Sequence, residues 1–197
     1  MTIIGKVGSV SYGLGRARSE GMWPAVCAVL LKVDQGELPA GLILSDSSAG
    51  MVPYEAVADE AVGTGDGTEK NFTHTLAKAP AMPGSVEITD GVETFTDDGL
   101  GRLAGSAGGT GTVVYATGAV AVGFNAAPAN AAAITADYQR EPAAVLDEPV
   151  DTAESGSGLV IRMGPVQNEM LKVGAVTPAS PSDTLLAALV SRHIYPV

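Results

Sequence analysis

The chain has 197 residues, of which 46% are hydrophobic but only 5% aromatic, and it contains 25 glycines and 12 prolines. This composition excludes a chain that is disordered throughout, and it favours short strands and turns over long helices. The net charge of −11 argues against general binding to nucleic acid, and the single cysteine excludes an internal disulfide framework or a cysteine-based zinc site.

The N-terminal segment differs in charge from the rest of the chain. The first 32 residues carry four basic side chains and one acidic side chain, a net charge of +3, whereas the whole chain carries −11. We therefore interpret residues 1–20 as a mildly basic N-terminal arm. Such an arm either docks on an acidic partner surface or is an ordinary solvated tail.

An apolar run extends from Trp23 to Leu31. It is too short to cross a membrane, and Met1–Lys6 lacks the basic start and long apolar region of a secretory signal. We therefore expect a protein that is made in a cytoplasm and does not bind membranes. Because the single cysteine, Cys27, lies within this run, we predict that it is a buried structural thiol.

Two short strands are predicted next. Leu38–Gly41 leads into an apolar strand at residues 42–44, and Ser45–Gly50 forms a polar turn. Met51–Tyr54 then forms the second strand.

Residues 59–141 consist of short alternating segments separated by strong turn signals. The dipeptide Asp90-Gly91 lies between two alternating runs, and both of its residues tolerate a positive φ, so we predict a hairpin there. Thr117-Gly118 predicts a second hairpin in the same way. The strands predicted for this region are residues 71–76, 85–89, 92–96, 112–116, 119–124 and 134–138.

The stretch Gly99–Phe124 is crowded with glycine and begins like a loop that binds phosphate. Such a loop needs a strand, then glycines, then a helix whose N-terminus faces the anion. Here the glycines lead into the β-branched strand at residues 112–116, and no Gly-Lys-Ser/Thr ending is present. We interpret these glycines as turn and loop positions rather than as a nucleotide site.

Strands are predicted again at residues 143–146 and 159–164, with a flexible loop at residues 155–158 between them.

A helix is predicted near the C-terminus. Ser182 can accept hydrogen bonds from backbone N–H groups at its start, and Arg192 and His193 place positive charge at its end. Pro196 is expected to end it. The apolar face of this helix consists of Leu185, Leu186, Leu189 and Val190.

The predicted fold is therefore mainly β (α+β). Residues 21–58 and 142–197 form one discontinuous β-rich core with a short C-terminal helix. Residues 59–141 form an all-β sandwich that is inserted into this core at a surface loop.

The sequence offers few candidates for catalysis. Neither His74 nor His193 has a partner motif, so a surface or capping role is favoured for both. The acidic turn at Asp97 and Asp98 could bind calcium, but it lacks the ligand spacing of a calcium loop, and a solvated turn is favoured. Acidic residues within 147–151 indicate a charged loop or a partner contact. We predict no catalytic residue, metal or cofactor, and we favour a structural or binding protein over an enzyme.

Four segments outside residues 59–141 form an ordered pattern. They are LPAGLILSDSSAGMVPY at 38–54, AAVLDEPVD at 143–151, GSGLVIRMGPVQNEML at 156–171 and TLLAALVSRHIYPV at 184–197. In this order they resemble the lambda-type head decoration protein family of tailed bacteriophages. The middle region is similar to a β module that recurs in phage virion proteins, although the small decoration protein has no such insert.

The resemblance implies a cement protein on the virion surface. Members of this family bind the major capsid protein as homotrimers and stabilise the expanded shell, and their N-terminal arm orders on the capsid. In this chain Lys6, Arg16 and Arg18 would then contact acidic capsid surface. Trp23 would either anchor the arm at the interface or belong to the core.

Two other functions are compatible with the sequence. One is an adhesion module on the virion, in which the β insert binds a host receptor or glycan; the absence of tryptophan from the insert weakens it. The other is a hydrolase of unknown type, which would need a pocket that includes His74 or His193.

Overall fold

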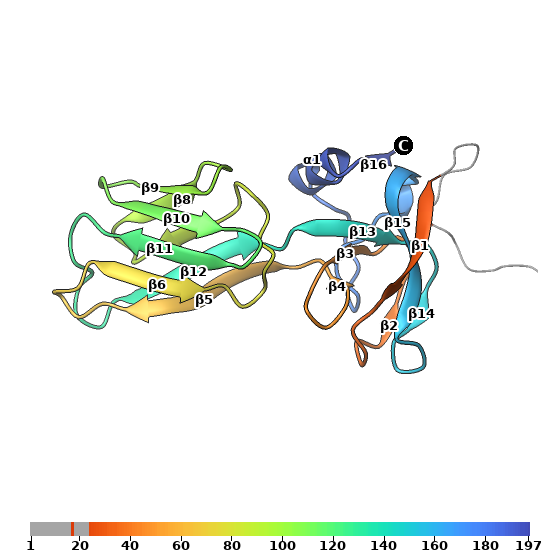
Figure 1. Ribbon diagram of the computed structural model, residues 1–197, viewed down its shortest axis with the longest axis horizontal. Coiled ribbons are helices and arrows are strands. Elements are labelled where there is room, and N and C mark those ends of the chain that lie inside the picture. The colour runs from red at the N-terminus through yellow and green to blue at the C-terminus, as the bar shows by residue number, and fades with distance from the viewer. Residues whose placement is uncertain (1–16, 18–23) are drawn as a thin grey trace, which may run out of the picture.

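The computed structural model describes residue 17 and residues 24–197. Two lobes lie along its long axis, one built on a six-stranded sheet with a short α-helix and the other on an eight-stranded sheet (Figure 1). We call the first, residues 24–55 and 140–197, the core lobe, and the second, residues 56–139, the module. The predicted mainly β fold class is confirmed.

The core lobe combines strands from both ends of the chain. Its sheet has the order β1-β15-β13-β3-β4, and β16 pairs in parallel with the end of β15. The four strands predicted here from the alternating and apolar segments are present as β3, β4, β13 and β15. The elements of this lobe are β1 (Ala25–Leu30), β2 (Glu37–Leu38), β3 (Ile43–Ser45), β4 (Val52–Pro53), β13 (Pro142–Leu146), β14 (Val150–Asp151), β15 (Ser157–Val166), a 3-10 turn (Asn168–Met170), α1 (Asp183–Ser191) and β16 (Ile194–Pro196).

The middle of this sheet is buried on both faces. On one face Ile43, Val145 and Ile161 pack with the buried leucines of α1. On the other face the neighbouring residues Leu44 and Val160 belong to a second cluster. This alternation follows from the period of two along a strand, and it explains why β3, β13 and β15 are so strongly apolar.

Helix α1 begins as predicted. The Oγ of Ser182 accepts a hydrogen bond from the Leu185 backbone N–H at 3.3 Å, which satisfies one otherwise unpaired donor. Leu185 and Leu189 are buried, whereas Val190 is 46% exposed, so the apolar face is narrower than predicted.

The end of α1 differs from the prediction. The helix ends at Ser191, and the chain turns at His193, which has a φ of 62°. The following residues form β16, in which Ile194 lies opposite Gly164 of β15. The prediction that Pro196 ends the helix is therefore wrong, because pairing with β15 gives these last residues a strand conformation.

The module is a single curled sheet. Its strand order is β5-β12-β7-β8-β9-β10-β11-β6, and the sheet nearly closes because β5 and β6 approach each other. Both predicted hairpins are present, with Ile88 of β7 opposite Phe95 of β8 and Val113 of β10 opposite Val120 of β11. The strands are β5 (Ala56–Thr64), β6 (Asn71–Thr75), β7 (Glu87–Thr89), β8 (Thr94–Asp97), β9 (Arg102–Gly105), β10 (Thr110–Val114), β11 (Ala119–Gly123) and β12 (Ala133–Gln139).

All three phenylalanines of this aromatic-poor chain pack in the core of the module. The rings of Phe95 and Phe124 meet edge to face at 4.9 Å between centroids, and those of Phe72 and Phe124 do so at 5.8 Å. This is the arrangement that the quadrupoles of aromatic rings favour.

The strands of the module begin at Ala56, slightly before the predicted insertion at residues 59–141. The division of the chain into domains stays a prediction.

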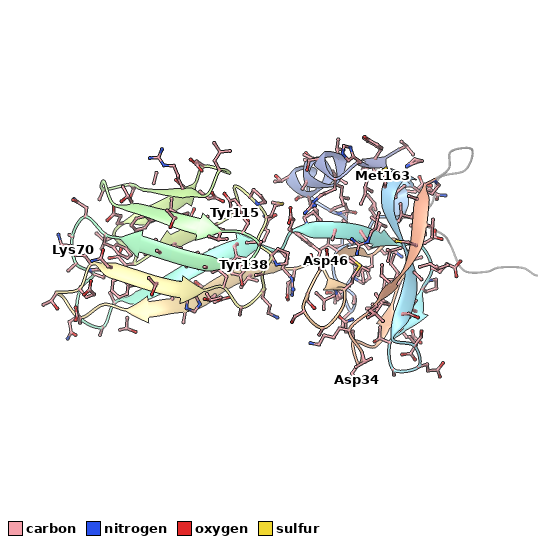
Figure 2. All side chains as sticks on the ribbon, in the orientation of Figure 1. Asp34, Asp46, Lys70, Tyr115, Tyr138 and Met163 are labelled. Atoms are coloured by element: carbon pink, nitrogen blue, oxygen red, sulfur yellow. The ribbon has the colours of Figure 1, made fainter. Side chains whose placement is uncertain are left out.

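The lobes meet where the chain crosses between them. Arg140 follows β12 and is 5% exposed. Its Nη1 donates to Glu55 Oε1 at 3.2 Å, and its Nη2 donates to the carbonyls of Asp46 at 3.2 Å and Ala79 at 3.4 Å. Asp46, which is labelled in Figure 2, belongs to the core lobe, and Ala79 belongs to the module by its position within residues 56–139. One buried guanidinium therefore binds both lobes at their junction.

Candidate functional site

Strand β1 is an edge strand with exposed apolar side chains. Among the described residues it pairs with β15 alone, and Figure 1 places it at the end of the core lobe far from the module. Leu30 is 74% exposed. Ala25 lies opposite Met163, which is 52% exposed, and Ala28 lies opposite Leu159. We call these five residues the β1 edge. An apolar edge strand is a template for binding another chain.

The prediction of a buried thiol is wrong. Cys27 is exposed, although it lies in the middle of an apolar run. The run forms β1. Two hydrophobic clusters cover the two faces of β3, β13 and β15, and β1 contributes to them only Val26 and Val29, which are partly buried. An apolar run thus became the edge of a sheet rather than its centre.

The residues predicted to form the capsid contact of the arm all precede residue 24. Lys6, Arg16, Arg18 and Trp23 lie outside the described residues. Ala17, within the predicted arm, is described and buried, and its N–H donates to the Asp147 carbonyl at 3.2 Å. Its carbonyl accepts a hydrogen bond from the Gln167 N–H at 2.9 Å. A truncation that tests the arm must therefore end before Ala17.

The glycine-rich stretch encloses a buried carboxylate. Glu93 is 3% exposed, and its Oε1 accepts hydrogen bonds from the N–H groups of Gly109 at 2.7 Å and Ala107 at 3.2 Å. Its Oε2 accepts one from the Asn125 N–H at 2.8 Å. A Cβ on residue 109 would lie only 2.7 Å from Glu93 Oε1, so the backbone can approach this closely only with glycine. The loop does bind an anion, but the anion is a side chain of the same chain.

The acidic turn is held by internal hydrogen bonds. Asp97 Oδ1 accepts from the Tyr115 hydroxyl at 2.6 Å and from the Gly99 N–H at 3.0 Å, and its Oδ2 accepts from the Gly84 N–H at 2.6 Å. Asp98 Oδ1 accepts from two further backbone N–H groups. Burial and the hydrogen bond to Asp97 raise the pKa of Tyr115 to about 12. In the described part of the chain, no three His, Cys, Asp or Glu side chains lie together as metal ligands would.

His74 helps to close the module. Its Nε2 lies 2.9 Å from Glu60 Oε1, which links β6 to β5 across the seam of the curled sheet. The Tyr138 hydroxyl donates to Glu60 Oε2 at 2.6 Å, and the Ala77 N–H donates to Glu60 Oε1 at 2.8 Å. Burial alone would raise the pKa of Glu60, but the hydrogen bonds from Tyr138, His74 and Ala77 outweigh it and hold the pKa below its ordinary value of 4.5.

This network predicts a pH-dependent stability. Replacing Glu60 with glutamine should lower the free energy of unfolding at pH 7 by about 1–2 kcal/mol, because a charged acceptor of several hydrogen bonds is lost. Since the folded pKa is depressed, the carboxylate stabilises the fold above the unfolded pKa, and this contribution is lost as the pH falls through the folded pKa. Urea unfolding at pH 7 and at about pH 3 should therefore show a deficit that shrinks in acid. A deficit that is equal at both pH values would contradict this account.

His193 lies apart from this network. It is exposed at the turn after α1, and its Nδ1 lies 3.3 Å from the Tyr195 hydroxyl.

No helix in the described part of the chain is long and apolar enough to span a membrane.

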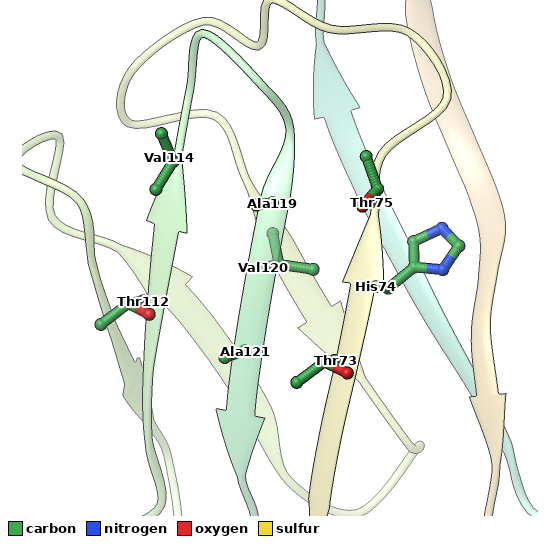
Figure 3. Close-up of a pocket in the computed structure, with 8 residues that line it drawn as sticks. All are labelled: Thr73, His74, Thr75, Thr112, Val114, Ala119, Val120 and Ala121. Atoms are coloured by element: carbon green, nitrogen blue, oxygen red, sulfur yellow. The ribbon is translucent and has the colours of Figure 1, made fainter.

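A shallow hollow of about 560 Å³ lies on the outer face of the module (Figure 3). Thr73 and Thr75 of β6 and Thr112 of β10 border it, and the small side chain of Ala121 lies between Thr73 and Thr112 in register. The lining presents hydroxyl groups and small apolar side chains, and none of its described residues is a tryptophan, tyrosine or phenylalanine. His74 also lines the hollow, but its ring is directed toward β5, where it meets Glu60 (Figure 3).

Two of these features were missed from the sequence. The burial of Glu93 had a signal, because Glu93 lies two residues before Phe95 in the strand predicted at 92–96, and such residues point to the same face; in the structure β8 begins one residue later, at Thr94. The β1 edge had no such signal, since the apolar run from Trp23 is equally compatible with a central strand.

No family model, curated protein or solved structure matches the chain.

Proposed function

We propose that this chain is a head decoration protein of a tailed bacteriophage. In this role it would bind the major capsid protein on the virion surface as a homotrimer and stabilise the expanded shell, without catalysing a reaction. The four segments that resemble the decoration family support this proposal, because they all fall in the core lobe and leave the module apart from them.

The observation that carries the proposal is the β1 edge. It follows the segment predicted to be a capsid-binding arm, and among the described residues its strand pairs with β15 alone. Leu30 and Met163 are 74% and 52% exposed, and in the described part of the chain the edge is open before Leu30, whose carbonyl accepts a hydrogen bond from the Met51 N–H at 2.9 Å. Strand addition at such an edge supplies main-chain hydrogen bonds, and the apolar side chains supply buried area. Contacts repeated over a shell then add avidity.

The arrangement of the lobes fits this function. The β1 edge and the module lie at opposite ends of the long axis (Figure 1). A chain that binds the shell through the β1 edge would therefore carry the module outward, where it does not interfere with the contact.

Charged substitutions at the β1 edge test the proposal. The double variant Leu30→Glu/Met163→Glu should bind expanded shells at least about tenfold more weakly, because two apolar contacts are lost and two charges are buried. Binding is measured by co-sedimentation with shells, and circular dichroism verifies the fold of the variant.

The matched control is Val92→Glu/Leu100→Glu. These two side chains are 85% and 87% exposed in loops of the module, so the control makes the same chemical change away from the β1 edge. It should bind like the unmodified chain. Equal binding by both double variants would show that the β1 edge is not the contact.

The threonine-lined hollow favours a second candidate, an adhesion module that binds a glycan. Hydroxyl groups from Thr73, Thr75 and Thr112 could exchange hydrogen bonds with sugar hydroxyls, but the described residues of the lining include no tryptophan, tyrosine or phenylalanine on which a sugar could stack. Glycan-array binding that is lost in Thr73→Val/Thr112→Val would support this candidate, and a blank array would reject it.

A further inference from the structure

A pocket of about 430 Å³ lies at the junction of the two lobes. Lys32, Tyr54 and Glu55 of the core lobe line one part of it, and Lys78 of the module lines another. Arg140 lies where the chain crosses between the lobes and also lines the pocket. We call this cavity the junction pocket.

The junction pocket is cationic in a strongly acidic protein. It is lined by Lys32, Lys78 and Arg140, whereas Glu55 is the one acidic side chain among its described lining residues. The whole chain has a net charge of −11, so this excess of positive charge is local. A cavity lined by one sign of charge concentrates ions of the opposite sign.

The single carboxylate does not satisfy the cations around it. Glu55 Oε1 is shared, at 3.2 Å from Lys78 Nζ and 3.2 Å from Arg140 Nη1. The nearby carboxylates have other partners, since Asp46 Oδ1 lies 3.3 Å from Arg162 and Glu141 forms an ion pair with Arg192. The pocket therefore has positive charge without a matching counter-ion among the described residues.

Arg140 also retains unused hydrogen-bonding capacity. Its guanidinium is almost fully buried, and its Nε has no hydrogen-bond partner among the described residues. Arginine has five N–H donors in a planar fork that matches the oxygens of a carboxylate. The Nε is closed to solvent in this structure, so what Arg140 offers an anion in the pocket is its positive charge, which only the shared Glu55 carboxylate offsets.

The remaining walls indicate an organic ligand. Val52, Pro53 and Ala175 also line the pocket and offer apolar contact to a carbon skeleton. Thr177 adds a hydroxyl group at the rim, and Tyr54 is buried, with its hydroxyl donating to Gln139 Oε1 at 2.8 Å. A bare inorganic ion would leave the apolar walls unused.

We propose that the junction pocket binds an organic anion through its carboxylates. The ligand is either a small free polycarboxylate or the acidic side chains of a partner protein, which share this chemistry. Lys32 and Lys78 bind the carboxylates, the charge of Arg140 adds to their attraction, and the apolar walls contact the carbon chain. Because core lobe and module both line the pocket, the bound anion would also strengthen the contact between them.

Calorimetric titration of the full chain tests this proposal at constant ionic strength. The probes are citrate for a free polycarboxylate and tri-glutamate for acidic side chains, with tri-glutamine as the uncharged control. We expect saturable binding of one anion per chain for at least one acidic probe and none for tri-glutamine. The probe that binds more tightly identifies the source of the carboxylates.

Paired variants separate the pocket from general charge. Lys32→Met/Lys78→Met should weaken binding at least about tenfold, because two charged contacts are lost. Lys70→Met serves as the control; this lysine lies at the far end of the module and donates to the Asn125 carbonyl (Figure 2). Lys70→Met should bind like the unmodified chain. Absence of saturable binding to either acidic probe, or equal weakening in both variants, would overturn the proposal. No shell is used, so the result does not depend on capsid binding.

Discussion

Replacing Glu93 with alanine is expected to lower the free energy of unfolding of the module by about 3–5 kcal/mol. The substitution leaves three backbone N–H groups, those of Ala107, Gly109 and Asn125, without their acceptor. It also opens a cavity beside Phe95 in the module core, because a Cβ at residue 109 would touch both Glu93 and Phe95. Urea unfolding followed by circular dichroism measures this loss.

Two variants control for this effect. Glu87→Ala removes an exposed glutamate from β7 of the same hairpin and should change the stability by less than about 0.5 kcal/mol. Gly109→Ala leaves Glu93 in place but introduces a Cβ 2.6 Å from the Gly123 carbonyl, so it should be destabilising as well. If Glu93→Ala is no more harmful than Glu87→Ala, the glycine-rich stretch is not built around this carboxylate.

Replacing Arg140 with methionine is expected to lower the free energy of unfolding by about 2–4 kcal/mol. Methionine retains much of the length of the side chain but removes the charged donors to Glu55, Asp46 and Ala79. Glu55 is 42% exposed and can be rehydrated, so the main loss comes from the two carbonyls. We also expect faster amide hydrogen exchange at the junction, because the lobes lose the group that binds both.

Arg162 provides the matched control for Arg140. It is also an arginine that contacts Asp46, but its side chain is 43% exposed and bonds to the carboxylate at 3.3 Å. Exposed ion pairs contribute little, so Arg162→Met should cost less than about 1 kcal/mol. Similar losses in the two variants would show that the junction does not depend on a buried guanidinium.

The sequence was most informative where local chemistry determines the structure. Asp90-Gly91 predicted its hairpin because the turn needs a positive φ, and Gly91 has a φ of 84°. The Asp90 side chain also accepts hydrogen bonds from the N–H groups of Val92 and Glu93. Ser182 predicted the start of α1 for a similar local reason, since a helix leaves its first N–H groups unpaired.

The features that could not be predicted depend on residues far apart in the chain. The network around Glu60 includes Tyr138, which is 78 positions away along the chain, and no pattern in the sequence indicates this contact. The bonds of Arg140 to Asp46 and Ala79 likewise join segments that are distant in sequence. The exposure of Cys27 could not be predicted for the same reason. An apolar strand can have the same composition whether it lies at the centre of a sheet or at its edge.

Co-sedimentation of the purified chain with undecorated phage shells tests the central claim most directly. Under the proposed function, the expanded and unexpanded shells of the phage that would encode the chain are compared at equal subunit concentration. We predict saturable binding to the expanded shells and none to the unexpanded shells, because a cement protein recognises a surface that expansion creates. Absence of binding to expanded shells would contradict the claim that this chain is a head decoration protein.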